Sequence, residues 1–139
     1  MDRRRVIAVS RDATVMDAVR AMVEGRIGIT PVLDGGRLLG VLSQSDIVAR
    51  VVLKGLDPAT TAIADVMTSP VVTVRETADR SSTIRLMIDH DLHHLPVVDV
   101  DGRVLAVISM RQALRAEVQD LKQTVWELAA DTMVVAHGG

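Results

Sequence analysis

Hydrophobic and polar positions follow each other in blocks that occur in the same order twice along the chain. Short β-branched runs at residues 6–9 and 71–74 predict two buried strands. After each run comes a polar stretch and then apolar residues at helical spacing, which predict one helix near residues 15–25 and another near 80–89. We expect Gly25 to end the first of these helices and residues 89–91 to end the second.

The second part of each block predicts two more strands and one more helix. Residues 31–33 and 38–42 form one strand pair, and residues 96–98 and 104–108 form the other, with Asp- and Gly-containing turns between them. The following helix opens at a serine in both blocks, Ser43 and Ser109, and serine is a favoured N-cap. The first copy adds Asp46 three residues later, which is close to a capping box. Each block therefore predicts a β-α-β-β-α unit.

The two blocks are copies of one unit. Residues 31–43 return with little change at 96–109, and the second copy carries one extra turn residue. An internal repeat of this kind indicates one supersecondary unit used twice. The fold class is therefore α/β (α+β), with two tandem repeats related by a pseudo-two-fold axis. We place repeat one at residues 1–58 and repeat two at 59–118, with a linker rich in helix breakers around 54–61.

Residues beyond about 113 follow a different pattern, in which apolar positions alternate steps of four and three. These positions are Leu114, Val118, Leu121, Val125 and Leu128. Such a seam is typical of a coiled coil, yet two heptads are too few to stabilise an isolated pair. The 113–131 helix is therefore expected to pack either on the body of the protein or on a second chain. Residues 132–139 are expected to form a tail, in which a short strand over 132–136 is one alternative.

Composition narrows the function classes. The 139 residues are 48% hydrophobic with a single aromatic residue, Trp126, so the core must be aliphatic. A net charge of −2 predicts no general attraction to nucleic acid, and no apolar run approaches the ~20 residues that a membrane span needs. The chain has no cysteine, which excludes disulfides and sulfur-ligated zinc. We expect a cytoplasmic protein without nucleic-acid or membrane partners.

Several of these segments resemble those of a known family. The stretch from Asp65 to Val74, the Leu95–Asp99 strand and the Gly102 turn before a serine-opened helix are similar to cystathionine-β-synthase-type (CBS) domains, two of which form a Bateman module. The resemblance covers roughly residues 6–50 and 63–118, and the shared order of weak motifs in both repeats gives it weight. It implies a regulatory module rather than an enzyme, one that binds an adenosine-containing ligand between its repeats and often forms a homodimer.

The resemblance also implies a binding site at one cleft between the repeats. The acid of the family's Ser/Thr-x-x-Asp motif accepts hydrogen bonds from both ribose hydroxyls, and repeat one keeps this motif as Ser43, Ser45 and Asp46. Across the cleft, the family pattern places a segment that opens the second repeat and a loop that lines the base and contacts phosphate. The matching residues are Met67, Thr68, Leu92, His93 and His94.

The opposite cleft has lost these groups. It has Gln112 in place of the acid, Gly28 and Ile29 in place of the histidines, and Arg3 in place of the threonine. We therefore expect one competent site and one degenerate site per chain. AMP is the first choice of ligand, ahead of ADP, ATP or S-adenosylmethionine, because two histidines offer little charge for a triphosphate. No separate cofactor is required, and an unidentified effector protein would read the bound state.

Each of these residues also has a plainer interpretation. Asp46 can serve only as a helix cap. His90, His93 and His94 can be surface residues, or metal ligands if they share a helix face. Ser43 has no evident base beside it, so hydrolase chemistry is not indicated. The rival function is a ligand-free module in which the repeats serve for dimerisation and scaffolding.

Overall fold

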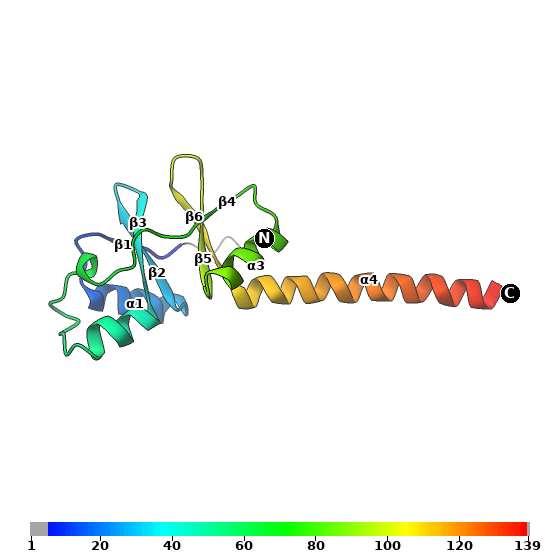
Figure 1. The fold of residues 1–139 in the computed structure, drawn as a ribbon, viewed down its shortest axis with the longest axis horizontal. Helices are drawn as coiled ribbons and strands as arrows, with labels where there is room; N and C mark the ends of the chain where they lie inside the picture. The colour runs from blue at the N-terminus through cyan, green and yellow to red at the C-terminus, as the bar shows by residue number, and fades with distance from the viewer. Residues whose placement is uncertain (1–5, 139) are drawn as a thin grey trace.

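The computed structural model describes residues 6–138 and contains two β-α-β-β-α repeats (Figure 1). Repeat one consists of β1 (Val9–Ser10), α1 (Val15–Gly25), β2 (Ile29–Asp34), β3 (Arg37–Ser43), α2 (Gln44–Asp46) and the wider helical turn η1 (Ile47–Val52). The segment between η1 and β4, residues 53–73, is called the linker from here on, and it contains the short helix η2 (Ile63–Asp65). Repeat two consists of β4 (Val74–Arg75), α3 (Arg80–Asp89), β5 (His94–Val98), β6 (Val104–Ser109) and α4 (Met110–Gly138).

The two sheets have the same topology. In each, a short first strand pairs in parallel with the second strand, and the second pairs antiparallel with the third, giving the orders β1-β2-β3 and β4-β5-β6. The register shifts between Val32 and Leu33 in repeat one and between the corresponding Val97 and Val98 in repeat two. The predicted fold class and the repeated unit are confirmed down to this shared irregularity.

The first strand of each repeat is shorter and later than its β-branched run predicts. Val9–Ser10 and Val74–Arg75 are the paired residues, whereas most of 6–9 and 71–74 lies outside the strands. These runs are only partly buried. The prediction from β-branched composition was therefore wrong for most of these residues, because a strand needs a partner as well as propensity.

Helix α1 ends at Gly25 as predicted, but for a different reason. The left-handed residue after the helix is Arg26, with φ of 51°. A Cβ on Gly25 would lie 2.8 Å from the Cδ1 of Ile7. Gly25 therefore serves close packing against the segment before β1, and Arg26 supplies the left-handed turn. In repeat two, α3 ends at Asp89 and the left-handed residue is Asp91.

The core is aliphatic, as the composition requires, and it is divided between the repeats. One cluster belongs to repeat one and the linker: Val15, Ala18, Met22, Val32, Leu42, Val51, Ile63 and Val66. A smaller cluster belongs to repeat two: Ile84, Met87, Leu95 and Ala113. The linker residues Ile63 and Val66 are almost fully buried in the first cluster, so the linker is part of the body of repeat one.

Helix α4 leaves the body as one long rod (Figure 1). Ala113, near its beginning, is buried against repeat two. Arg80 of α3 forms an ion pair with Asp120, and its side chain lies 3.9 Å from a carboxylate oxygen of Glu117. The backbone of α4 remains helical to Gly138, so residues 132–138 continue the helix instead of forming the separate tail or short strand considered from the sequence.

Candidate functional site

Asp46 is a helix cap and a link between the repeats at the same time. Its backbone N–H donates to the Ser43 hydroxyl at 3.1 Å, and its carboxylate accepts from the Ser43 N–H at 3.0 Å. These two bonds complete the capping box at the start of α2. The carboxylate also accepts from the hydroxyl of Thr68, at 3.1 Å to either oxygen. The structure thus brings together three of the residues that the sequence predicted for one cleft.

Thr68 reaches Asp46 because the linker is added to the edge of β3. Thr68 and Val41 exchange backbone hydrogen bonds of 2.8 and 3.0 Å. The side chain of Ser69 donates to the carbonyl of Leu39. Gly40 permits this approach, since a Cβ there would lie 2.6 Å from the Met67 sulfur and 2.9 Å from the Thr68 carbonyl oxygen. The missing side chain of Gly40 is therefore what lets the linker lie flat on the strand.

Arg50 stabilises the same junction. Its guanidinium donates to the carbonyls of Val66 and Met67 at 3.1 and 3.0 Å, and it lies 3.9 Å from the Asp46 carboxylate. The carboxylate of Asp46 is thus surrounded by donors from repeat one and the linker, and its side chain is only 11% exposed. A ribose bound here would share Asp46 with the hydroxyl of Thr68.

The other predicted residues of this cleft lie in three different environments. Ser45 is exposed on the first turn of α2. Met67 packs against the core of repeat one, and Leu92 packs against the core of repeat two. The side chain of Leu92 therefore has a structural role, and only its backbone remains available for the predicted contact with a base.

His93 and His94 occupy the positions that Gly28 and Ile29 occupy in repeat one. The carbonyl of His93 accepts from the N–H of Met110, as the carbonyl of Gly28 accepts from that of Gln44. His94 opens β5 opposite Ser109, and Ile29 opens β2 opposite Ser43. A Cβ on Gly28 would lie 3.3 Å from the Cε1 of His94 and 3.2 Å from the amide oxygen of Gln44. His94 therefore lies between the repeats, beside the helix that carries Asp46.

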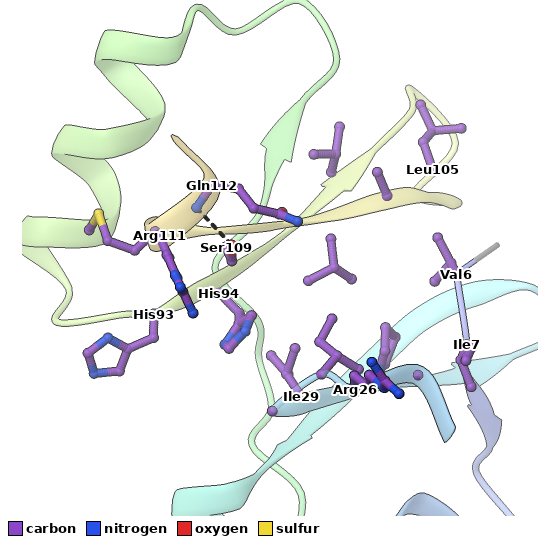
Figure 2. Close-up of a pocket in the computed structure, with 18 of the residues that line it drawn as sticks. Val6, Ile7, Arg26, Ile29, His93, His94, Leu105, Ser109, Arg111 and Gln112 are labelled. Atoms are coloured by element: carbon purple, nitrogen blue, oxygen red, sulfur yellow. Dashed lines mark hydrogen bonds between the residues drawn. The ribbon is translucent and has the colours of Figure 1, made fainter. Parts of the chain in front are cut away.

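His93 and His94 both line a cavity of about 1660 Å³ between the repeats (Figure 2). Its lining includes Gly28, Ile29 and Gln112, the described residues of the cleft expected to be degenerate, whereas Arg3 lies outside the described residues. Ser109 also lines it. The lining contains none of Ser43, Ser45, Asp46, Met67 and Thr68. The open space that the histidines face is thus on the side of Gln112 rather than that of Asp46.

Sequence reasoning missed the arginines of the cavity that the histidines line. Arg26, Arg111 and Arg115 line the same cavity, together with one acid, Glu76. In Figure 2, Arg111 extends from the start of α4 into the region between His93 and His94. Its place directly before Gln112, in the motif that opens the last helix, was the available signal. This cationic group is suited to a phosphate.

The far part of the cavity is apolar. Val6, Ile7, Leu105 and Ala106 line it, and Figure 2 places Val6 and Leu105 well away from the histidines. Between the two parts, the Ser109 hydroxyl accepts from the N–H of Gln112 at 3.0 Å and caps α4. The cavity therefore combines apolar surface with positive charge, from Arg111 beside the histidines and from Arg26 near Ile7 in Figure 2. A nucleotide has apolar and anionic parts that such a lining can contact.

The pKa of His94 is lowered from its ordinary value of 6.5, first by burial and then by the neighbouring charge of His93. The ring of His94 is therefore more readily neutral than a histidine in water. A bound phosphate would oppose both effects because an anion favours the imidazolium.

Among the side chains that the structure describes, those of residues 6–130, no group of three or more His, Asp or Glu is arranged to hold a metal ion. None of the helices in the described part of the chain has the length and apolar character needed to cross a membrane.

The sequence of this chain is similar to several known proteins. An uncharacterized protein of Methanopyrus kandleri is 31% identical over 83% of this chain and 59% of its own length. The inosine-5'-monophosphate dehydrogenase of Methanocaldococcus jannaschii is 32% identical over 79% of this chain, which corresponds to 21% of the enzyme. The chain thus spans about three fifths of the first relative and one fifth of the second.

Solved structures give the same result. A signal-transduction protein with CBS domains from Burkholderia ambifaria superposes with a TM-score of 0.78 at 29% identity, covering 85% of this chain and 86% of that one. CBSX2 of Arabidopsis thaliana in complex with AMP superposes with a TM-score of 0.71 at 27% identity, covering 84% of this chain and 90% of that one. The cytosolic domain of the Mg²⁺ channel MgtE in complex with ATP gives 0.66 at 34% identity over 79% and 44%.

The CBS domain family matches residues 1–53 and 63–119, which correspond to the two structural repeats. With both repeats matched and the topology shared, this chain belongs to the CBS domain family and is a CBS-pair regulatory module.

Proposed function

We propose that this protein senses an adenosine nucleotide, with AMP as the first choice, bound between its two repeats. The observation that carries the proposal is the cationic group of His93, His94 and Arg111 at a cavity between the repeats. The similarity to CBSX2 with AMP and to MgtE with ATP supports the class of ligand. The family membership supports a regulatory role and not a catalytic one.

In this proposal the phosphate lies on the cationic group and the ribose hydroxyls are bound by Asp46, which does not line the cavity in this structure, so the ligand must extend beyond the cavity to reach it. A carboxylate can accept from two hydroxyls at once, and Asp46 is held in place by its capping box. The Thr68 hydroxyl, which donates to Asp46 without ligand, would turn toward the nucleotide. Ser43, Ser45, Met67 and the backbone near Leu92 complete the site as expected from the sequence.

The proposed mechanism is a shift between relative orientations of the repeats. Asp46 belongs to repeat one, whereas the histidines and Arg111 belong to repeat two. A ligand that contacts both groups favours the orientation in which both contacts form. A partner protein in the same compartment, which we propose to be the cytoplasm, would read that orientation.

The test measures binding of AMP, ADP, ATP, NAD and S-adenosylmethionine, each with and without magnesium, by thermal melting and calorimetry. A ligand at ~100 times its dissociation constant should add about 2.7 kcal/mol to the free energy of unfolding. Asp46→Asn should weaken binding about 10- to 100-fold, because hydrogen bonds to a charged group contribute about 1.5–3 kcal/mol.

Asp17→Asn is the matched control. Asp17 is the acid of the capping box that opens α1, so this variant loses the same kind of cap at a distance from both clefts. It should bind nucleotide as the wild type does. If Asp46→Asn binds normally and Gln112→Ala loses affinity, the ribose lies in the cavity beside Gln112 and the assignment of Asp46 is wrong.

A ligand-free scaffold remains the second candidate, and the exposed apolar side chains of α4 favour it. Leu121 and Val125 are each 63% exposed on a helix that projects from the body. No thermal shift with any of the nucleotides would support this alternative over the sensor.

A further inference from the structure

We propose that the apolar stripe of α4 is a self-association surface, on which the same stripe of a second copy packs in parallel orientation. The stripe is defined here as Leu114, Val118, Leu121 and Val125, with Leu128 at the next position of the same pattern. Only the first residue of the stripe, Leu114, also lines the cavity between the repeats, and the inference does not rest on nucleotide binding.

The stripe leaves much apolar surface in water in the single chain. Its four defining side chains are 44–63% exposed, and Trp126 beside them is 74% exposed. Val118, Leu121, Lys122, Val125 and Trp126 line a shallow groove of about 240 Å³ along the helix. Exposed apolar surface that is continuous in this way marks an interaction site.

The body of the protein occupies a different face of α4. Ala113 is buried against repeat two, and Arg80 of α3 contacts Glu117 and Asp120. Figure 1 shows the rest of the helix projecting clear of both sheets, with space along it for another helix. A partner on the stripe would therefore leave Ala113 and the ion pair of Arg80 with Asp120 in place, whereas Glu117, 3.9 Å from Arg80, borders both faces.

A second copy is the occupant that the spacing favours. The steps of four and three give a period of 3.5 residues, and a helix with that period matches another with the same period along its length. A second copy of this chain supplies a helix with that same period. The same apolar residues then cover each other in both copies.

The charges beside the stripe favour the parallel orientation. Glu117 lies on one border of the stripe, and Arg115 and Lys122 lie on the other. In a parallel pair, Glu117 of one helix faces Lys122 of the other, and the contact occurs twice. In an antiparallel pair, the border with Arg115 and Lys122 faces its own copy, so cations oppose cations. Only the parallel pair has complementary charge.

The predicted association is reversible. From Leu114 to Leu128 the stripe covers about two heptads, or ~21 Å of helix. That length buries less surface than a permanent dimer interface does. We therefore expect a monomer–dimer equilibrium that depends on concentration.

The first experiment is sedimentation equilibrium of the full chain over a wide range of concentration. Wild type should pass from monomer to dimer, and Leu121→Glu should shift the transition at least 10-fold toward higher concentration. Gln119→Glu, on the same helix but off the stripe, is the matched control and should behave as wild type. A monomer at all concentrations would overturn the proposal, as would a dimer that Leu121→Glu leaves unchanged. Circular dichroism checks that both variants fold.

The second experiment tests orientation by crosslinking. The chain has no cysteine, so Val118→Cys and Val125→Cys each introduce a single thiol. A parallel pair in register brings each residue opposite its own copy, and both variants should form covalent dimers on oxidation. An antiparallel pair can bring only one of the two positions opposite itself. Crosslinking of one variant alone, or of neither, would overturn the parallel arrangement.

Discussion

The outer edges of the two sheets differ although the sheets share one topology. In repeat one, the linker pairs with β3 through Thr68 and Val41, and Gly40 makes room for it. In repeat two, Ala106 occupies the place of Gly40, opposite Val97. Among residues 6–138, the contact at the outer edge of this sheet is a bridge between Arg37 and Arg103 where β6 begins, and the linker does not reach it. The edge of β3 is thus closed by the linker, and the edge of β6 lines the open cavity.

The N-termini of the last helices of the two repeats, α2 and α4, also differ in their side-chain contacts. Ser43 and Asp46 form a reciprocal cap that also binds Thr68, whereas Ser109 caps α4 alone and the side chain of Gln112 faces the cavity. The backbone pattern has been kept in both copies, while the side chains at equivalent positions have become different. Duplication therefore preserved the fold and left the two clefts free to diverge.

The largest effect expected from this comparison is at Gly40. Gly40→Ala should reduce the free energy of unfolding by about 1–3 kcal/mol, because the new Cβ would overlap the Met67 sulfur and the Thr68 carbonyl oxygen. Ala106→Val adds bulk at the equivalent position of repeat two, where the side chain is exposed, and should change stability by less than about 0.5 kcal/mol. Urea unfolding of both variants checks this, and equal losses would refute the difference between the edges.

A smaller difference is expected between the two capping serines. Ser43→Ala removes a partly buried cap and should cost about 1 kcal/mol. Ser109→Ala removes an exposed cap of the long helix α4 and should cost about half as much. Melting temperatures of the two variants measured side by side would reveal the order, and the reverse order would show that the reciprocal bond of Asp46 adds nothing.

The smallest effect is the pH dependence caused by His94. Since its folded-state pKa lies below the ordinary 6.5, the unfolded chain binds more protons near that pH. Stability without ligand should therefore fall as pH decreases through 6.5, and His94→Gln should reduce that slope. His90→Gln, at the exposed end of α3, is the control and should leave the slope unchanged.

Nucleotide should reverse the sign of this pH dependence. A phosphate beside His94 favours the protonated ring, so affinity should rise as pH decreases from 8 through the pKa. Calorimetric titration of AMP at several pH values measures this. If the affinity of the wild type does not depend on pH, the histidines do not contact the phosphate.

Most of the fold could be predicted from the sequence because its signals are local and occur twice. Turn glycines, capping serines and the helical spacing of apolar residues identified both β-α-β-β-α units. The first strands were misplaced because pairing depends on a distant partner. The continuation of α4 beyond residue 131 was not predicted, because the alternating apolar spacing that indicated this helix ends at Leu128.

The candidate site was harder to predict because side chains reach it from distant segments. The contact between Asp46 and Thr68 followed from the resemblance to the family, and the structure brings the two residues together. The open cavity beside Gln112 did not follow from the resemblance, because its size depends on which segments cover the edges of the two sheets. Arg26 and Arg115 face that cavity from the end of α1 and from α4, and nothing in their local sequence marks them for it.

The first turn of α4 has a mechanical consequence. Ser109, Arg111 and Gln112 border the cavity, and the helix that starts there continues without interruption for 29 residues, or ~43 Å. It is a lever arm that starts at the cavity between the repeats. A tilt of ~5° at its start would move the far end by roughly 4 Å, by simple geometry over a helix of that length. Amplification of this kind converts a side-chain adjustment into a displacement on the scale of a helical turn.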